Sequence, residues 1–201
     1  MIESLKPLYT RLLGPFAKIC AALHLLPNTV TATGLIMSAV AAWLIATGAW
    51  LLAAICIGIC ACTDGLDGLL AKLTGKNTRF GAIFDSSTDR ITEILWFGGL
   101  LFFYCGREPI GRTEILFTFI ALSGSMMVSY VRARCEGVNV PCKGGFFQRP
   151  ERIVVFFVCL LAGPNIMTWG LVALSCATYA TVIERLIRAY ITCKQNGNTR
   201  G

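Results

Sequence analysis

The sequence predicts an all-α integral membrane protein with six transmembrane helices, preceded by an N-terminal amphipathic helix in the membrane interface. Of its 201 residues 55% are hydrophobic and 14% charged, whereas a soluble domain has about 25% charged residues. The mean hydropathy of +0.66 argues against intrinsic disorder. The apolar runs are long and do not alternate, so we expect helices rather than a barrel. No repeat or long linker divides the chain, so we expect a single domain over residues 1–201.

Residues 1–24 are predicted to form the interfacial segment. Basic residues fall between apolar residues that recur at helical spacing, namely Leu5, Leu8, Leu12, Leu13, Phe16, Ile19 and Leu23. Pro15 interrupts this pattern after Gly14. We therefore expect two short amphipathic helices that lie in the plane of the membrane surface.

Six apolar spans are predicted to follow. Residues 30–62 carry no charge, which is too long for one span, and Gly48 predicts a turn near 47–50 that divides the run in two. The second span continues to about Lys72. The other spans are built on the runs 91–105, 115–131, 153–161 and 166–183. The run 153–161 is short and needs the preceding residues as part of its helix.

The basic residues lie almost entirely on one predicted side of the membrane. Of the 18 Lys and Arg residues, only Arg107 and Arg112 fall on the other side. The positive-inside rule makes the basic side cytoplasmic, together with both termini, and we expect a prokaryotic inner or plasma membrane. No block of Lys and Arg with interleaved aromatic residues occurs, so we expect no nucleic-acid partner.

The only aspartates in the chain lie within 26 residues and form two pairs, Asp64 with Asp67 and Asp85 with Asp89. Spacings of three and four residues put each pair on one helix face. Counted from Trp50 at the far side, Asp64 lies about 21 Å into a hydrocarbon core about 30 Å thick. Counted from Tyr104, Asp89 lies about 22 Å from the same far side. Both pairs are therefore predicted at one depth, in the cytoplasmic half of the membrane.

Four ionised carboxylates at that depth require cations. Hard divalent ions prefer oxygen ligands, and Mg²⁺ that keeps some waters and binds a phosphate-bearing substrate fits best. Small residues surround the aspartates, namely Gly65, Gly68, Ala71 and Gly81. They favour a ligand pocket, and a tight helix–helix contact is the alternative.

Residues 64–89 read D-x2-D-G-x2-A-K-x8-G-x3-D-x3-D, which resembles the signature of the CDP-alcohol phosphotransferases. Lys72 stands where that family has Arg. Lysine keeps the charge but loses the bidentate fork, so the difference concerns contact with the diphosphate or nucleotide and not the reaction.

The resemblance implies an enzyme, a Mg²⁺-dependent CDP-alcohol phosphatidyltransferase of phospholipid biosynthesis. It would transfer a phosphatidyl-type group from a CDP-linked lipid such as CDP-diacylglycerol to an alcohol, and release CMP. By the resemblance, Asp64, Asp67 and Asp85 hold two Mg²⁺ ions, or Mn²⁺ in their place. Asp89 lies beside them at the metal site and is the catalytic general base on the acceptor hydroxyl.

The same resemblance implies a binding site for the CDP-lipid. Its residues would be Asn28, Thr31, Gly68, Ala71, Lys72 and Gly81. Asn28 and Thr31 belong to the segment Pro-Asn-Thr-Val-Thr at 27–31, which is similar to the family's Pro-x3-Thr segment. For these two residues helix capping is an equal alternative.

Two further segments resemble the branch of this family that uses inositol phosphate. They are Ser-Tyr-Val-Arg-Ala-Arg-Cys-Glu-Gly at 129–137 and Gln-Arg-Pro-Glu-Arg at 148–152, with Cys135 and Gln148 departing from the pattern. The resemblance implies that the acceptor is bound by Ser129, Arg132, Pro150, Arg152 and Arg185. A phosphorylated acceptor needs arginine forks to hold it beside four carboxylates, although the positive-inside rule alone also predicts arginines at these helix ends.

Inositol 1-phosphate is therefore the expected acceptor, a soluble alcohol phosphate. Glycerol 3-phosphate is the alternative within the same enzyme class, as in a phosphatidylglycerophosphate synthase. A divalent-cation carrier is the alternative from another class, but a carrier should place polar residues in both halves of the membrane. The resemblance also suggests a homodimer, and Gly98, Gly99 and Gly124 are available for helix packing in either state.

Overall fold

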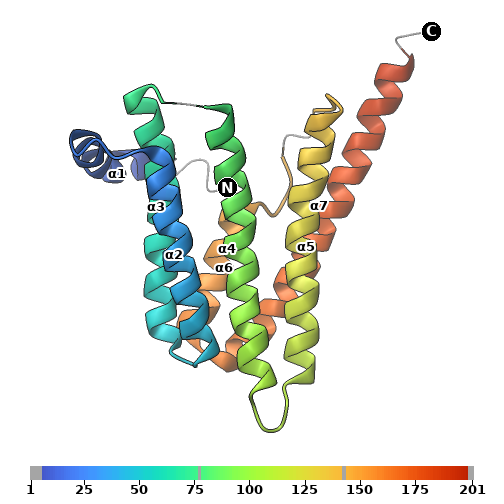
Figure 1. The fold of residues 1–201 in the computed structure, drawn as a ribbon. Coiled ribbons are helices and arrows are strands. Elements are labelled where there is room, and N and C mark those ends of the chain that lie inside the picture. Colours follow the sequence, from blue (N-terminus) through green and yellow to red (C-terminus); the bar gives the residue numbers. More distant parts are fainter. Residues whose placement is uncertain (1–5, 77, 142–143, 199–201) are drawn as a thin grey trace. The chain divides into compact units, whose positions relative to one another are not determined.

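The computed structural model describes residues 6–76, 78–141 and 144–198, and within these ranges it describes the side chains of residues 11–195. This part of the chain forms seven helices, which Figure 1 labels: α1 Lys6–Ala22, α2 Pro27–Ala46, α3 Trp50–Thr74, α4 Arg79–Cys105, α5 Arg112–Gly137, α6 Arg149–Ala162 and α7 Pro164–Asn198. The chain divides after Arg107 into two compact units, which are described separately below.

Four of these helices, α2, α3, α5 and α7, are long and apolar enough to cross a membrane, which indicates an integral membrane protein. The other two predicted spans correspond to α4 and α6. Helix α4 has the length, but Asp85, Asp89, Arg90 and Glu93 lie in it. Helix α6 has 14 residues, about 21 Å of helix against a hydrocarbon core of about 30 Å.

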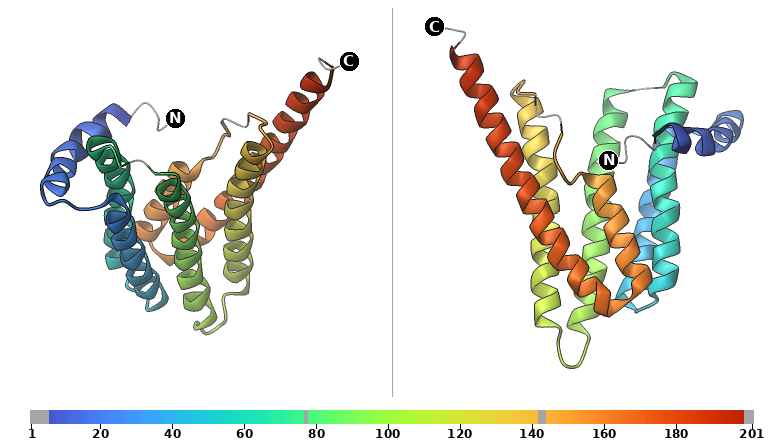
Figure 2. Two further views of the ribbon diagram at one scale, coloured as in Figure 1. Left: turned by 45° about the horizontal axis from the view of Figure 1, so that its top comes forward. Right: turned by 180° about the vertical axis from the view of Figure 1, so that it is seen from behind.

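Helix α1 differs from the prediction of two short pieces, because it continues through Pro15 as a single helix. Proline removes one backbone hydrogen bond, but its fixed φ angle is compatible with a helix. The preceding Gly14 has no neighbouring atom near the position of a side chain, so the helix has room to bend there. Leu5 lies outside the described residues, as does the side chain of Leu8. Helix α1 packs on α3 and runs across it rather than alongside it (Figures 1 and 2).

In the first unit α2 is the middle helix, since it packs along both α3 and α4. Two glycines make these approaches close. A Cβ on Gly99 of α4 would lie 2.5 Å from the carbonyl oxygen of Ala42 on α2, and a Cβ on Gly34 of α2 would lie 2.8 Å from Oγ1 of Thr63 on α3. The turn predicted near 47–50 is confirmed, and Gly48 adopts a φ of 82° between α2 and α3.

In the second unit α7 packs along both α5 and α6. Gly124 of α5 allows the close approach of Thr178 on α7. Gly163 ends α6 with a φ of 92° and Pro164 begins α7, so Gly163 makes the turn between the two helices.

Several helices extend beyond the apolar runs that predicted them. Helix α4 begins at Arg79, twelve residues before the run 91–105, and α7 continues to Asn198, well past residue 183. Apolar runs mark only the part of a helix that faces hydrocarbon or core, whereas the backbone hydrogen bonds continue into the polar ends.

Candidate active site

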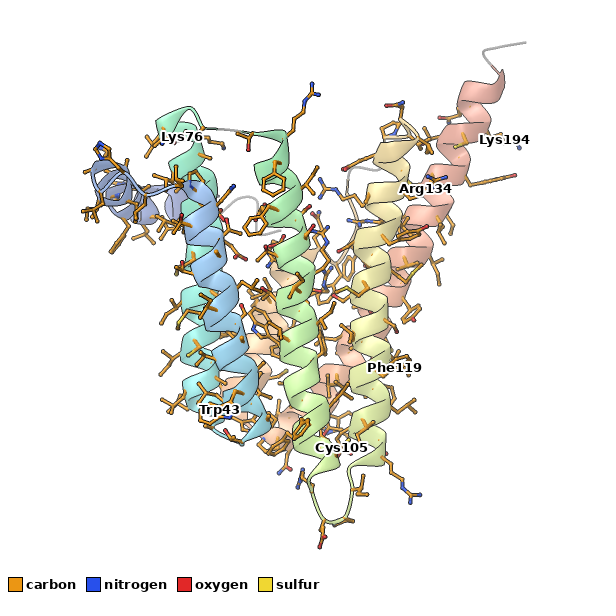
Figure 3. All side chains as sticks on the ribbon, in the orientation of Figure 1. Trp43, Lys76, Cys105, Phe119, Arg134 and Lys194 are labelled. Carbon is orange, nitrogen blue, oxygen red and sulfur yellow. The ribbon has the colours of Figure 1, made fainter. Side chains whose placement is uncertain are left out.

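The two aspartate pairs lie on two long helices of the first unit. Asp64 and Asp67 belong to α3, and Asp85 and Asp89 belong to α4. Each helix is unbroken from its aspartates to the far-side aromatic residue used for the depth estimate, so the rise counted along both helices holds. Figure 3 marks the two ends of this unit, with Lys76 at one end and Trp43 and Cys105 at the other.

Asp67 is the centre of the carboxylate cluster. Its side chain is 6% exposed, and the other three aspartates are half-buried. Asp64 on the same helix and Asp85 on α4 both lie close enough to repel it electrostatically. Carboxylates from two helices therefore act electrostatically on Asp67.

Thr31 links α2 to this cluster. Its Oγ1 donates a hydrogen bond of 2.5 Å to Oδ2 of Asp67 and lies 3.2 Å from the carbonyl oxygen of Pro27. The N-cap of α2 is Leu26, which makes no side-chain capping bond. Asn28 and Thr31 thus lie inside the helix, and the capping alternative is wrong for both.

The remaining residues predicted for the CDP-lipid lie on the same three helices. A Cβ on Gly81, in the first turn of α4, would lie 3.4 Å from Oδ1 of Asn28, so the starts of α2 and α4 meet. Gly68 is exposed, and a Cβ there would meet nothing within 4 Å. Ala71 is half-buried and Lys72 exposed toward the end of α3. The face of α3 at Gly68 is therefore open.

Arg90 is a cation at the cluster that the sequence analysis used only to assign sidedness. Its Nη1 lies 3.7 Å from Oδ2 of Asp89 and also donates to the carbonyl oxygen of Ser86. The position of Arg90 directly after Asp89 in the sequence could have indicated this contact. A guanidinium there offsets part of the negative charge on α4.

The residues predicted for the acceptor all lie in the second unit. Ser129 is half-buried on α5, and Pro150 is exposed in the first turn of α6. Arg132 is exposed on α5 and donates from Nε to Glu136 at 2.9 Å. Arg152 of α6 is 5% exposed.

The guanidinium of Arg185 on α7 donates hydrogen bonds to backbone carbonyl groups. It is 3% exposed, its Nη1 donates to the carbonyl oxygen of Val128 on α5, and its Nε and Nη2 lie 3.2 and 3.0 Å from the carbonyl oxygen of Gly144. The same guanidinium therefore ties the segment at Gly144 to the α5–α7 pair, a structural role that the sequence analysis did not anticipate.

A comparison with known families decides the identity of the chain. Residues 24–183 match the family model of the CDP-alcohol phosphatidyltransferases. The chain belongs to this family. As a CDP-alcohol phosphatidyltransferase it is an enzyme, a transferase of phospholipid biosynthesis, and the family resemblance drawn from residues 64–89 is confirmed.

Individual members of the family are also similar to this chain. Phosphatidylinositol phosphate synthase of Corynebacterium glutamicum is 35% identical over 181 residues, 87% of this chain and 82% of the relative. Archaetidylinositol phosphate synthase of Methanothermobacter thermautotrophicus is 31% identical over 191 residues, 93% of each chain. These relatives are similar over nearly their whole length.

Solved structures of phosphatidylinositol phosphate synthase (PgsA1) from Mycobacterium tuberculosis have the same fold. The complex with CDP-DAG is 30% identical and superposes with a TM-score of 0.83, covering 90% of this chain and 94% of that chain. The complex with manganese and citrate is 30% identical with a TM-score of 0.82, covering 89% and 88%.

The aspartate cluster of this phosphatidyltransferase fits a divalent cation by the chemistry of its donors. Hard divalent ions take carboxylate oxygens, and carboxylates that repel one another are stabilised by a cation between them. In the part of the chain that the structure describes, no three His, Cys, Asp or Glu side chains group closely enough to hold an ion. The structure thus brings Asp64 and Asp85 toward Asp67 without closing a coordination shell.

Proposed function

We propose that this CDP-alcohol phosphatidyltransferase transfers the phosphatidyl group of CDP-diacylglycerol to inositol 1-phosphate and releases CMP. The electrostatic interaction of Asp64 on α3 and Asp85 on α4 with Asp67 carries the proposal. It supplies the acidic site that a diphosphate with its divalent cations needs. The similarity to phosphatidylinositol phosphate synthases favours the acceptor.

Asp64, Asp67, Asp85 and Asp89 would hold two Mg²⁺ ions, or Mn²⁺ in their place. Such ions, when bound, neutralise the diphosphate and the developing charge of the leaving phosphate. Thr31 orients the Asp67 carboxylate by its hydrogen bond. Manganese in the solved relative supports a divalent cation in this family.

Asp89 would be the catalytic base. Its carboxylate accepts the proton of the acceptor hydroxyl, the hydroxyl oxygen bonds to the β-phosphorus, and the bond from that phosphorus to the bridging oxygen of CMP breaks. Arg90 lies beside Asp89, with its Nη1 3.7 Å from Oδ2, and would offset part of the negative charge at this place.

The donor lipid would be held at the starts of α2 and α4 and along the open face of α3. The residues proposed for this site are Asn28, Thr31, Gly68, Ala71, Lys72 and Gly81. The open space at Gly68 leaves the helix backbone accessible, and Lys72 supplies an exposed cation for the diphosphate or nucleotide.

The acceptor would be held by residues of the second unit, namely Ser129, Arg132, Pro150, Arg152 and Arg185. Arginine forks match the geometry of a phosphate group. Arg132 is exposed, and among the described residues its ion-pair partner is an exposed carboxylate, Glu136. Such a surface pair is weak, so a phosphate can replace it.

The chain would act as one domain with six membrane spans, its active site and both termini in the cytoplasm of a prokaryotic cell, and it would form a homodimer. Helix α1 would lie in the interface. Leu12, Phe16 and Ile19 are exposed along it at helical spacing, and Leu23 is exposed just after its end, which suits contact with lipid. The Lys and Arg pattern supports the orientation.

The test is release of CMP by the purified protein with CDP-diacylglycerol and Mg²⁺. Inositol 1-phosphate, inositol, glycerol 3-phosphate and serine are added singly. We expect CMP only with inositol 1-phosphate, and a loss of about 10² to 10⁴-fold in Asp89→Asn. Glu108→Gln removes an exposed carboxylate outside the helices and is the matched control.

Other outcomes are equally informative. CMP release with glycerol 3-phosphate instead keeps the enzyme class and overturns the proposed acceptor. Release only with an ether-linked CDP-lipid changes the donor. Full activity in Asp89→Asn overturns its role as base.

A further inference from the structure

A buried polar contact joins α2, α3 and α4 of the first unit, on the side of the aspartate pairs toward the α2–α3 turn. The Ser38 hydroxyl on α2 donates to the carbonyl oxygen of Gly34 at 2.9 Å and accepts a hydrogen bond of 3.3 Å from Thr92 on α4. Sγ of Cys60 on α3 lies 3.4 Å from Oγ of Ser38 and 3.5 Å from the Gly34 oxygen. Ser38 is 1% exposed, so these contacts are shielded from water.

This contact continues the Thr31–Asp67 link along the α2–α3 pair. Ser38 follows Thr31 by seven residues, and Cys60 precedes Asp67 by seven in the antiparallel direction. Two helical turns, about 10 Å, therefore separate the two links. Thr92 lies three residues beyond Asp89 on α4, so the Ser38 contact lies within about two turns of both aspartate pairs.

The topology gives α2 control over the spacing of those pairs. Helix α2 packs along α3 and along α4, whereas α3 and α4 share few close backbone approaches among the described residues. The relative position of Asp64 and Asp67 with respect to Asp85 and Asp89 is therefore transmitted through α2. The Ser38 side chain of α2 contacts a polar group of α3, at Cys60, and a polar group of α4, at Thr92.

We infer that Ser38 is a positioning residue for the metal site, acting with Thr92. Its hydroxyl sets the axial register of α4 against α2 and α3, and thereby the separation of the two carboxylate pairs. The inference rests on the proposed function, because it concerns the divalent-cation site assigned there. A simple packing role would affect stability alone, whereas a positioning role changes the affinity of the aspartates for the ion.

The test measures the binding of Mn²⁺ to the purified protein through the loss of the electron paramagnetic resonance signal of free Mn²⁺. CMP release is measured on the same samples. Ser38→Ala removes the acceptor, and Thr92→Val removes the donor without a change in size. We expect each to raise the Mn²⁺ dissociation constant about tenfold, and Thr92→Ser to stay near the wild type. Because both changes break the bond between Thr92 and Ser38, the double variant should bind Mn²⁺ no more weakly than Ser38→Ala alone.

Ser175→Ala is the matched control. Ser175 is a buried serine of the second unit that also bonds its own helix, at Leu171, and a neighbouring helix, at Phe117. We expect it to lower thermal stability like Ser38→Ala and to leave Mn²⁺ binding unchanged. Wild-type affinity in Ser38→Ala and Thr92→Val, or an equal loss in Ser175→Ala, overturns the inference.

Asp67→Asn separates this inference from the proposed function. Loss of Mn²⁺ binding in Asp67→Asn together with unchanged binding in Ser38→Ala refutes only the positioning role. Absence of Mn²⁺ binding in the wild type, or full binding in Asp67→Asn, refutes the metal site itself and the inference with it.

Discussion

Thr31 on α2 donates a hydrogen bond of 2.5 Å to Oδ2 of Asp67 on α3, and each of the two side chains is 6% exposed. A hydrogen bond from a hydroxyl to a carboxylate is among the stronger ones in proteins. It leaves the other carboxylate oxygen of Asp67 in a defined orientation. The bond therefore connects the start of α2 to the acidic cluster.

Thr31→Val should lower kcat/KM for CMP release about tenfold and raise the metal concentration needed for half-maximal rate, because partners that orient ligands contribute this much. Thr31→Ser keeps the hydroxyl and should retain most activity. The control is Thr33→Val, since Thr33 is exposed and, among the described residues, bonds to the carbonyl of Val30 on its own helix. Equal effects of the Thr31 and Thr33 variants would contradict the assignment.

Lys72→Ala should raise KM for CDP-diacylglycerol about tenfold, which corresponds to about 1.4 kcal/mol, with little change in kcat. The physical reason is loss of an exposed cation near the donor site. Lys72→Arg keeps the charge and should bind at least as well. Lys76→Ala, an exposed lysine just beyond α3, is the control, and an equal rise in KM there would indicate a general effect of surface charge.

Arg185→Lys should lower the melting temperature in detergent, because it breaks a buried guanidinium contact to Val128 and Gly144. Hydrogen bonds to charged groups contribute about 1.5–3 kcal/mol each. Arg188→Lys, at an exposed arginine paired with Glu184, should leave the melting temperature nearly unchanged. If Arg185→Lys instead raises only KM for inositol 1-phosphate, acceptor binding outweighs the structural role.

Gly99→Ala should destabilise the protein by about 1–3 kcal/mol through overpacking. Its Cβ would lie 2.5 Å from a backbone oxygen of Ala42, which cannot move without shifting α2. Gly98→Ala is a close control, since a Cβ there meets nothing within 4 Å. Thermal unfolding of both variants distinguishes them, and equal melting temperatures would contradict the close approach of α2 and α4.

Much of the fold follows from local pattern. Long uncharged runs predict α2 and α3, and the turns at Gly48 and Gly163 are recognisable because their backbone conformations suit glycine. Apolar runs cannot mark where polar helix ends stop, so the start of α4 at Arg79 and the end of α7 at Asn198 were missed. A proline in the sequence does not show whether a helix ends or bends at that residue. For this reason the sequence predicted two short helices where Pro15 lies inside the single helix α1.

The sequence by itself showed the four aspartates and their pairing on helix faces, because helical spacing is local geometry, and it predicts their common depth. The tertiary structure alone decided which side chains support them. The bond from Thr31 to Asp67 and the contact of Ser38 with Thr92 join residues 36 and 54 positions apart. It also decided that Arg185 holds backbone carbonyls, because such contacts depend on how whole helices pack and leave no periodic signal in the chain.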